Sequence, residues 1–150
     1  MTNIRPAHGN DAAALVALGT AIGSEEGAWL LTSTGWRSVA EEDGVLAGRL
    51  SLARNPHPAS HHVADLGLMV AAGHRRRGVG RMLLEQAVAW ASEANVRKLE
   101  LHVFPWNEPA MKLYETFGFE REGVRREHYR RDGEYVDAIL MAYRLPPPTS

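Results

Sequence analysis

The fold of this chain is decided by a short basic stretch, Arg75-Arg76-Arg77-Gly78-Val79-Gly80. An apolar run, Leu66–Val70, comes just before it and predicts a strand. The segment that follows, Arg81–Trp90, carries apolar residues at helical spacing and predicts a helix. The glycine-containing turn therefore joins the end of a strand to the beginning of a helix.

A turn of this kind favours a bound anion. The first backbone N–H groups of a helix have no intrahelical partners and lie at the positive end of the helix dipole. Gly78 and Gly80 let a bulky group approach those N–H groups, and three arginines add positive charge. A phosphate or pyrophosphate meets these conditions. An ordinary solvated turn explains the same residues, so both interpretations stay open at this point.

Two common nucleotide-binding motifs do not match this stretch. A Walker A loop needs Gly, four residues, and then Gly-Lys followed by Ser or Thr, and the chain has no such run. A dinucleotide fingerprint needs a third glycine three residues after Gly80, where this chain has Leu83. Neither motif accounts for the turn.

Composition bounds the class of protein. The 150 residues, 45% hydrophobic and 23% charged, predict one globular domain over residues 1–145 and a loose Pro-rich tail at 146–150. A net charge of −1 gives no general attraction to nucleic acid. The lack of cysteine excludes a disulfide framework and a thiol nucleophile. Without an apolar signal region or membrane-spanning run, we expect a cytoplasmic protein that binds neither nucleic acid nor membrane.

Periodicity and turn residues predict the order of strands and helices. Strands are expected at 3–7, 36–41, 45–54, 61–70, 99–104, 119–130 and 134–145. Helices are expected at 12–22, 79–94 and 109–117, and residues 24–31 form either a further short helix or a loop. Asp43-Gly44 and Asp132-Gly133 predict hairpin turns. The predicted fold class is α/β (α+β), a mixed, mostly antiparallel sheet of about seven strands with helices on both faces.

A second candidate site lies on the helix that follows Asn107. Asn107, Ala110 and Tyr114 are spaced at i, i+3 and i+7, roughly on one helix face. The small residue between two polar ones leaves room for a thin ligand. Taken singly, Asn107 is also explained as a helix cap and Tyr114 as a half-buried core ring.

Together the two stretches resemble the GNAT-type N-acetyltransferase superfamily. In that family the fourth strand leads into a Q/R-x-x-G-x-G/A turn, which resembles Arg75, Gly78 and Gly80 here. A later family segment reads N-x-x-A-x-x-x-Y-x-x-x-G-F. It is matched by Asn107, Ala110, Tyr114, Gly118 and Phe119. The order of elements agrees as well, so the resemblance covers nearly the whole chain.

The resemblance implies acetyl-CoA as the cofactor. Its pyrophosphate would lie on the backbone amides of Arg76–Arg81, and its pantetheine arm would run along Leu68–Val70, where the fourth and fifth strands separate. Asn107 would bond to the pantetheine amides, and Tyr114 would lie near the sulfur. The implied cofactor-binding residues are Leu68, Met69, Val70, Arg75, Arg76, Arg77, Gly78, Val79, Gly80, Arg81, Asn107, Ala110 and Tyr114.

The implied reaction is direct transfer of an acetyl group to a primary amine, on a small molecule or a protein N-terminus. A phenol, with a pKa of about 10, stays protonated at neutral pH, so Tyr114 is the candidate general acid. A main-chain N–H near Met69 or Val70 would polarise the thioester carbonyl. The candidate bases are Asp65, His102, Glu25 and Glu26. For each of these four, a polar residue that faces solvent is the simpler explanation.

The acceptor side is expected around Glu25, Glu26 and Trp29, and in the last hairpin near Tyr129 and Tyr135. The scattered histidines show no spacing of a metal site. Two other classes compete with the enzyme. One is a non-catalytic acyl-CoA-binding regulatory module. The other is an interaction protein, a homodimer through the last strands, with exposed tryptophans at its interface.

Overall fold

A computed structural model describes residues 2–7, 36–74 and 78–146 of the chain. The helix expected at 12–22 and the ambiguous segment at 24–31 lie outside these residues. The same holds for five candidate site residues. They are Glu25, Glu26, Arg75, Arg76 and Arg77. Trp29, expected on the acceptor side, also lies outside.

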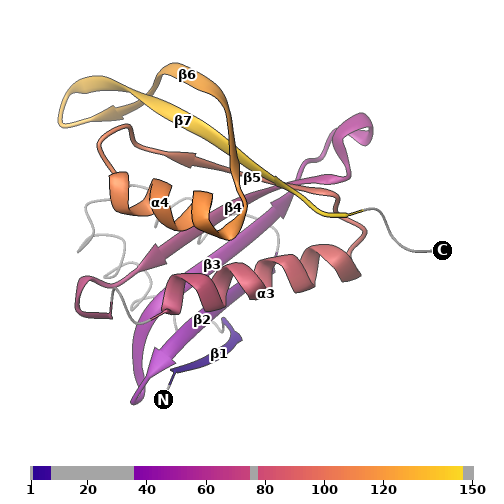
Figure 1. The fold of residues 1–150 in the computed structure, drawn as a ribbon, viewed down its shortest axis with the longest axis vertical. Helices are drawn as coiled ribbons and strands as arrows, with labels where there is room; N and C mark the ends of the chain where they lie inside the picture. Colours follow the sequence, from indigo (N-terminus) through magenta and orange to yellow (C-terminus); the bar gives the residue numbers. More distant parts are fainter. Residues whose placement is uncertain (1, 8–35, 75–77, 147–150) are drawn as a thin grey trace.

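The described residues form a seven-stranded sheet in the order β1-β2-β3-β4-β5-β7-β6 (Figure 1). The strands are β1 (Thr2–Pro6), β2 (Trp36–Glu42), β3 (Val45–Arg54), β4 (Val63–Val70), β5 (Lys98–Val103), β6 (Glu120–Arg131) and β7 (Glu134–Arg144). Neighbouring strands are antiparallel except for β4 and β5, which are parallel. This confirms the predicted mixed, mostly antiparallel sheet.

Two helices are described, α3 (Val79–Glu93) and α4 (Glu108–Phe117), together with the short 3-10 turns η2 (Pro58–Ser60) and η3 (Ala72–His74). Asn107 caps α4, because its Oδ1 accepts a hydrogen bond from the Ala110 N–H at 3.3 Å. Gly118, with a φ of 128°, ends the helix. The role of helix cap, one of the two explanations that the sequence allowed for Asn107, is confirmed.

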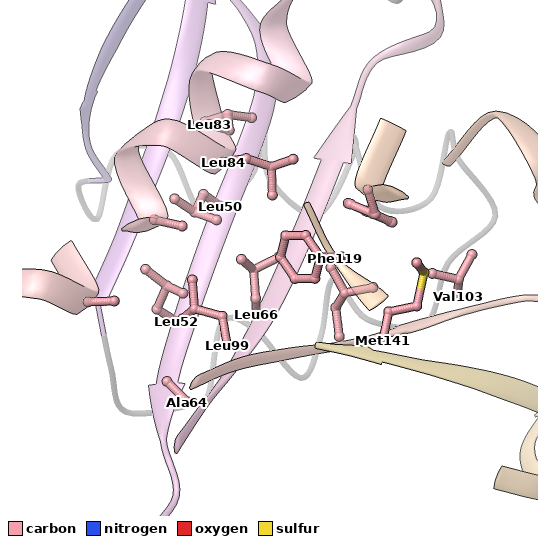
Figure 2. Close-up of a cluster of buried hydrophobic side chains, with 14 of the residues drawn as sticks. Leu50, Leu52, Ala64, Leu66, Leu83, Leu84, Leu99, Val103, Phe119 and Met141 are labelled. Atoms are coloured by element: carbon pink, nitrogen blue, oxygen red, sulfur yellow. The ribbon is translucent and has the colours of Figure 1, made fainter. Parts of the chain in front are cut away.

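Both described helices lie against the same face of the sheet (Figure 1). Leucines of α3 and of the central strands fill the layer between them, and Figure 2 shows the ring of Phe119 beside Leu66 in this layer. The described residues therefore confirm helices on one of the two predicted faces. The remaining expected helix, at 12–22, lies outside those residues.

The two hairpins have the predicted turns. Asp43 and Gly44 have φ of 53° and 81°, and Asp132 and Gly133 have φ of 50° and 80°. Positive φ at both central residues is the pattern of a type I′ turn, whose twist suits a tight hairpin. The fourth strand begins later than expected, at Val63, because the residues before it belong to the turn that follows η2.

We expect Leu99→Ala to lower the free energy of unfolding by about 2–5 kcal/mol, since a buried leucine leaves a cavity when it is truncated. The Leu99 side chain is 0% exposed and lies where β5 still pairs with β4. Val45→Ala is the control, because Val45 is 58% exposed and its truncation should change the free energy by no more than about 0.5 kcal/mol. Urea unfolding measures both. Equal effects would contradict the described core.

Candidate functional site

The parallel pair at the centre of the sheet comes apart. β4 and β5 are paired only at Val63–Asp65, opposite Lys98–Glu100. Beyond this point β4 stays paired with β3 as far as Val70, and β5 stays paired with β7 as far as Val103. The inner edges of the two strands therefore separate after Asp65, as the resemblance implies. We call this opening the β4–β5 gap.

Hydrogen bonds at the two ends of β4 show which of its main-chain groups face β3. The Val63 carbonyl accepts from the Asn55 N–H at 2.8 Å, and the Ala71 N–H donates to the Ala47 carbonyl at 2.8 Å. The register between β3 and β4 has no shift between these points. Main-chain groups of successive residues point to opposite edges of a strand, so the odd-numbered residues of β4 face β3.

The even-numbered residues of β4 consequently direct their N–H and C=O groups into the β4–β5 gap. These are Leu66, Leu68 and Val70. Leu68 and Val70 were predicted to contact a ligand arm through their main chain, and their orientation suits that role. Met69 was the other predicted residue, and its main chain points towards β3 instead. A ligand in the gap can thus pair with β4 as an additional strand would.

The beginning of α3 offers further N–H donors. Gly78 precedes the helix in the left-handed conformation, with φ of 78°, and no side chain caps the helix there. The first helical hydrogen bond runs from the Met82 N–H to the Gly78 carbonyl at 3.0 Å. The N–H groups of Val79, Gly80 and Arg81 make no hydrogen bond to another described residue. This arrangement suits an anion.

The two glycines of the turn have different roles. A Cβ on Gly78 would meet no atom of the described residues within 4 Å, so among these residues this glycine is required by its positive φ and not by close packing. A Cβ on Gly80 would lie 2.8 Å from the Leu113 Cδ2 of α4. The sequence predicted that both glycines admit an anion. For Gly80 the structure shows instead close packing of α3 against α4.

Polar groups line the other face of the sheet near the gap. Leu99, Leu101 and Val103 of β5 point into the core beneath the helices. The residues between them, Glu100 and His102, therefore point to the opposite face. Asp65 is paired with Glu100 across the last rung before the gap. Both candidate bases of the described residues thus lie on this second face.

His102 is held by a residue from the last hairpin. Its Nδ1 lies 2.8 Å from the Tyr129 hydroxyl oxygen, within hydrogen-bond distance. The His128 ring packs edge-on against His102, with 5.0 Å between the ring centroids. Tyr129 was expected on the acceptor side, and it is beside a candidate base. Tyr135, also expected there, pairs with Arg130 on the other side of the hairpin.

The surroundings shift the pKa of both candidate bases. Burial lowers the pKa of His102 below 6.5, and the positive charges of His128 and Arg125 lower it further, against the opposing effect of Glu100. Burial, followed by repulsion from Glu100, raises the pKa of Asp65 above 3.8, and Arg125 opposes this. His102 is consequently neutral at neutral pH, while Asp65 becomes a stronger base.

Several members of this cluster were not predicted from the sequence. Glu100 accepts an ion pair from the Lys98 Nζ at 3.1 Å and lies beside both candidate bases. The strand alternation that places His102 on the polar face also places Glu100 there, so that signal was available. Arg125 and His128 reach the site through irregular pairing in β6, which no local pattern of the sequence indicates.

Tyr114 lies on the helix side of the sheet. It is 7% exposed, belongs to the core and packs against Phe119, with 5.6 Å between their ring centroids. It is more deeply buried than the half-buried ring expected from the sequence. Ala110, one turn earlier, is partly buried, and Asn107 is exposed at the helix cap. The candidate acid and the candidate bases are thus on opposite faces.

Two further observations apply to the part of the chain that the structure describes. No three side chains of His, Asp or Glu in residues 2–7, 36–74 and 78–146 are grouped so as to hold a metal ion. In the same residues, neither helix has the length and apolar character needed to cross a bilayer.

Comparison with known proteins identifies relatives of this chain. The family model of the acetyltransferase (GNAT) family matches residues 18–119. The L-amino acid N-acetyltransferase AaaT of Escherichia coli (strain K12) is 39% identical over 105 residues. The matched region is 69% of this chain and 65% of AaaT, so the chain spans just under two thirds of that relative's length.

Solved structures share the fold. The ribosomal-protein-alanine N-acetyltransferase from Brucella melitensis is 27% identical, with a TM-score of 0.82 over 95% of this chain and 99% of that chain. A GCN5-related N-acetyltransferase from Kribbella flavida is 28% identical, with a TM-score of 0.79 over 96% of this chain and 98% of that chain. Both likenesses cover almost the whole length of each protein.

The cluster around His102 makes a prediction that does not depend on any activity. We expect His102 to titrate below pH 6.5 in NMR spectra of the folded protein. Arg125→Gln should move that pKa upwards, because it removes a positive charge that disfavours the imidazolium. Arg126→Gln removes the same charge from the next residue and should leave the value nearly unchanged. Titration of His102 at or above pH 6.5 in the unaltered protein would contradict the described surroundings.

Proposed function

Because the chain belongs to the acetyltransferase (GNAT) family, we propose that it transfers an acetyl group from acetyl-CoA to a primary amine. The observation that supports this most is the β4–β5 gap beside the uncapped beginning of α3. One feature offers main-chain partners to a chain of amides, and the other offers donors to an anion. These are the two kinds of group that CoA presents.

The described residues suit each part of CoA. The N–H groups of Val79, Gly80 and Arg81 would hold the pyrophosphate at the positive end of α3. The arginines that precede these residues in the sequence, Arg75–Arg77, would add electrostatic attraction for the pyrophosphate. They lie outside the described residues. Main-chain groups of Leu68 and Val70 would pair with the pantetheine amides. Asn107 and Ala110, at the beginning of α4, are proposed to border the same arm.

Tyr114 is proposed as the general acid. When bound, acetyl-CoA supplies an activated acetyl group and leaves as a thiol. A phenol with a pKa of about 10 carries its proton at neutral pH and can donate it to the departing sulfur. The burial of Tyr114 keeps water away from that proton transfer. The main-chain N–H of Val70 or Leu68, directed into the gap, would polarise the thioester carbonyl.

His102 is proposed as the general base, ahead of Asp65. With Nδ1–H donating to the Tyr129 oxygen, the other ring nitrogen keeps its lone pair and can accept a proton from the amine. Burial and the nearby positive charge lower the pKa of His102, so the ring is neutral at pH 7 and can accept a proton. The amine would approach from the face opposite α3 and α4.

The names of two relatives indicate which kinds of acceptor to consider. AaaT is described as acting on L-amino acids, and the Brucella protein is described as acting on the alanine of a ribosomal protein. The acceptor of this chain is proposed to be a primary amine of one of these two kinds. The family match at residues 18–119 includes Glu25, Glu26 and Trp29. These three remain the proposed acceptor-side residues.

The activity is tested by measuring thiol release from acetyl-CoA with a panel of amines. We expect Tyr114→Phe to lower kcat by about 10²-fold to 10⁴-fold, the usual contribution of a general acid. Stabilisation by CoA in thermal unfolding should persist, because the ring still packs. Tyr143→Phe is the control, since Tyr143 packs against Phe119 in the same aromatic cluster. Full activity of Tyr114→Phe at every pH would eliminate Tyr114 as the acid.

Substitutions of Gly78 test the anion site. Gly78→Ala places a methyl group just before α3 and adds roughly 1–2 kcal/mol of backbone strain. Gly78→Asn occupies the same space, but asparagine tolerates a positive φ better. We expect both variants to bind CoA about tenfold more weakly, or roughly 1.4 kcal/mol, by calorimetry. If Gly78→Asn bound CoA as tightly as the unaltered protein, the proposed approach of the pyrophosphate would be wrong.

A further inference from the structure

An exposed pair of rings follows β5. Phe104 and Trp106 stack face to face, with 4.9 Å between their centroids and 4° between their planes. The guanidinium carbon of Arg131 lies 5.2 Å from the centroid of Phe104 and 5.8 Å from that of Trp106. We call these three residues the aromatic shelf. Trp106 is 55% exposed, so the shelf faces solvent.

The shelf lies on the same face as the proposed base. The ring of Phe104 is 5.6 Å from that of Tyr129, whose hydroxyl is 2.8 Å from Nδ1 of His102. Along the chain, Phe104 is two residues beyond His102, a step of about 7 Å in an extended strand. An amine at His102 would therefore place the next few bonds of its molecule beside the shelf.

Irregular pairing in the last hairpin carries Arg131 to this position. The register between β6 and β7 shifts between Arg121 and Gly123 and again between Arg125 and Tyr129. Inside the second shift Glu127 has a φ of 48°, and its N–H donates to Asp137 Oδ1 at 2.8 Å. Bulges of this kind bend a strand and redirect its side chains. The bend turns Tyr129 and Arg131 towards the end of β5.

The guanidinium of Arg131 has stacking partners but no ionic one within the described residues. Glu134 is opposite Arg131 in the hairpin register, yet the two side chains form no ion pair. Other arginines near the surface do pair with carboxylates, such as Arg121 with Glu115 at 3.0 Å. A guanidinium stacked on rings keeps the N–H groups of its edge available for two parallel hydrogen bonds to a carboxylate.

We propose that the aromatic shelf binds a carboxylate of the acceptor. The acceptor of this enzyme is then a free amino acid, and its carboxylate lies on Arg131 while its amine lies at His102. Phe104 and Trp106 hold the guanidinium in place, with its central carbon 5.2 Å and 5.8 Å from their ring centroids. This assignment rests on the proposed acetyl transfer, and it separates the two acceptor kinds, because a protein N-terminus has an amide where a free amino acid has its carboxylate.

The test compares amino acids with their amides as acceptors. L-Phenylalanine and L-phenylalaninamide differ in the carboxylate, and the ratio of their kcat/KM values is measured for each variant. Comparing the ratios between variants cancels the different basicity of the two amines. We expect Arg131→Gln to lower the acid-to-amide ratio about tenfold or more, mainly through KM for the acid, as for loss of a hydrogen bond to a charged group.

Arg130→Gln is the matched control. It removes the same charge from the adjacent residue, which stacks on Tyr135 on the other side of the hairpin, and it should leave the ratio unchanged. Arg131→Lys should recover less than the full ratio, because an ammonium lacks the planar fork. Trp106→Leu should lower the ratio in the same direction, since it removes one of the two rings that the guanidinium contacts.

The possible results separate this assignment from the proposed activity. If the unaltered protein acetylates both compounds and Arg131→Gln lowers both kcat/KM values equally, or neither, the carboxylate site is overturned and the acetyl transfer stands. If the unaltered protein still prefers the amide after kcat/KM is corrected for the fraction of each amine that is neutral, the assignment is again overturned, in favour of a protein N-terminus. If no amine is acetylated although CoA stabilises the protein in thermal unfolding, the proposed activity itself is overturned.

Discussion

The central constraint of this structure is the short pairing between β4 and β5, which ends where Asp65 meets Glu100. β4 stays paired with β3, and β5 stays paired with β7, to the ends of the strands. These outer pairings hold β4 and β5 apart. Main-chain groups of β4 that face the gap, such as those of Leu68, are costly to bury unless water or a ligand satisfies them. An extended ligand with amides of its own is the group that fits there.

This separation divides the site between two faces. On one face, α3 and α4 bring Tyr114 and the N–H groups that we propose bind an anion, and both helices are fixed by the core. On the other, His102 and Asp65 meet side chains from the last hairpin. A substrate that approaches from this second face reaches the β4–β5 gap from the side opposite α3 and α4. The sheet itself therefore separates the proposed acid from the proposed base.

Much of the fold was predictable because its signals are local. The alternation of β4 and β5, the Asp-Gly turns, and the Asn107 cap of α4 depend on neighbouring residues, and each appears as expected. The role of Gly80 was not predictable, since it depends on the distant Leu113. The contact between His102 and Tyr129 was equally hidden, because it follows from register shifts that depend on how two long strands twist.

Substitutions in the two halves of the site differ in how much they destabilise the folded protein. Residues that face α3 and α4 are packed in the core, where a change of volume is felt by many neighbours. The shelf residues Phe104, Trp106 and Arg131 lie on a loop and an edge strand, and they contribute little to that core. Such positions can change without unfolding the protein. Acceptor specificity can therefore vary on this fold while the part that we propose holds the acetyl donor stays the same. Relatives with different acceptors on one shared fold require such a division.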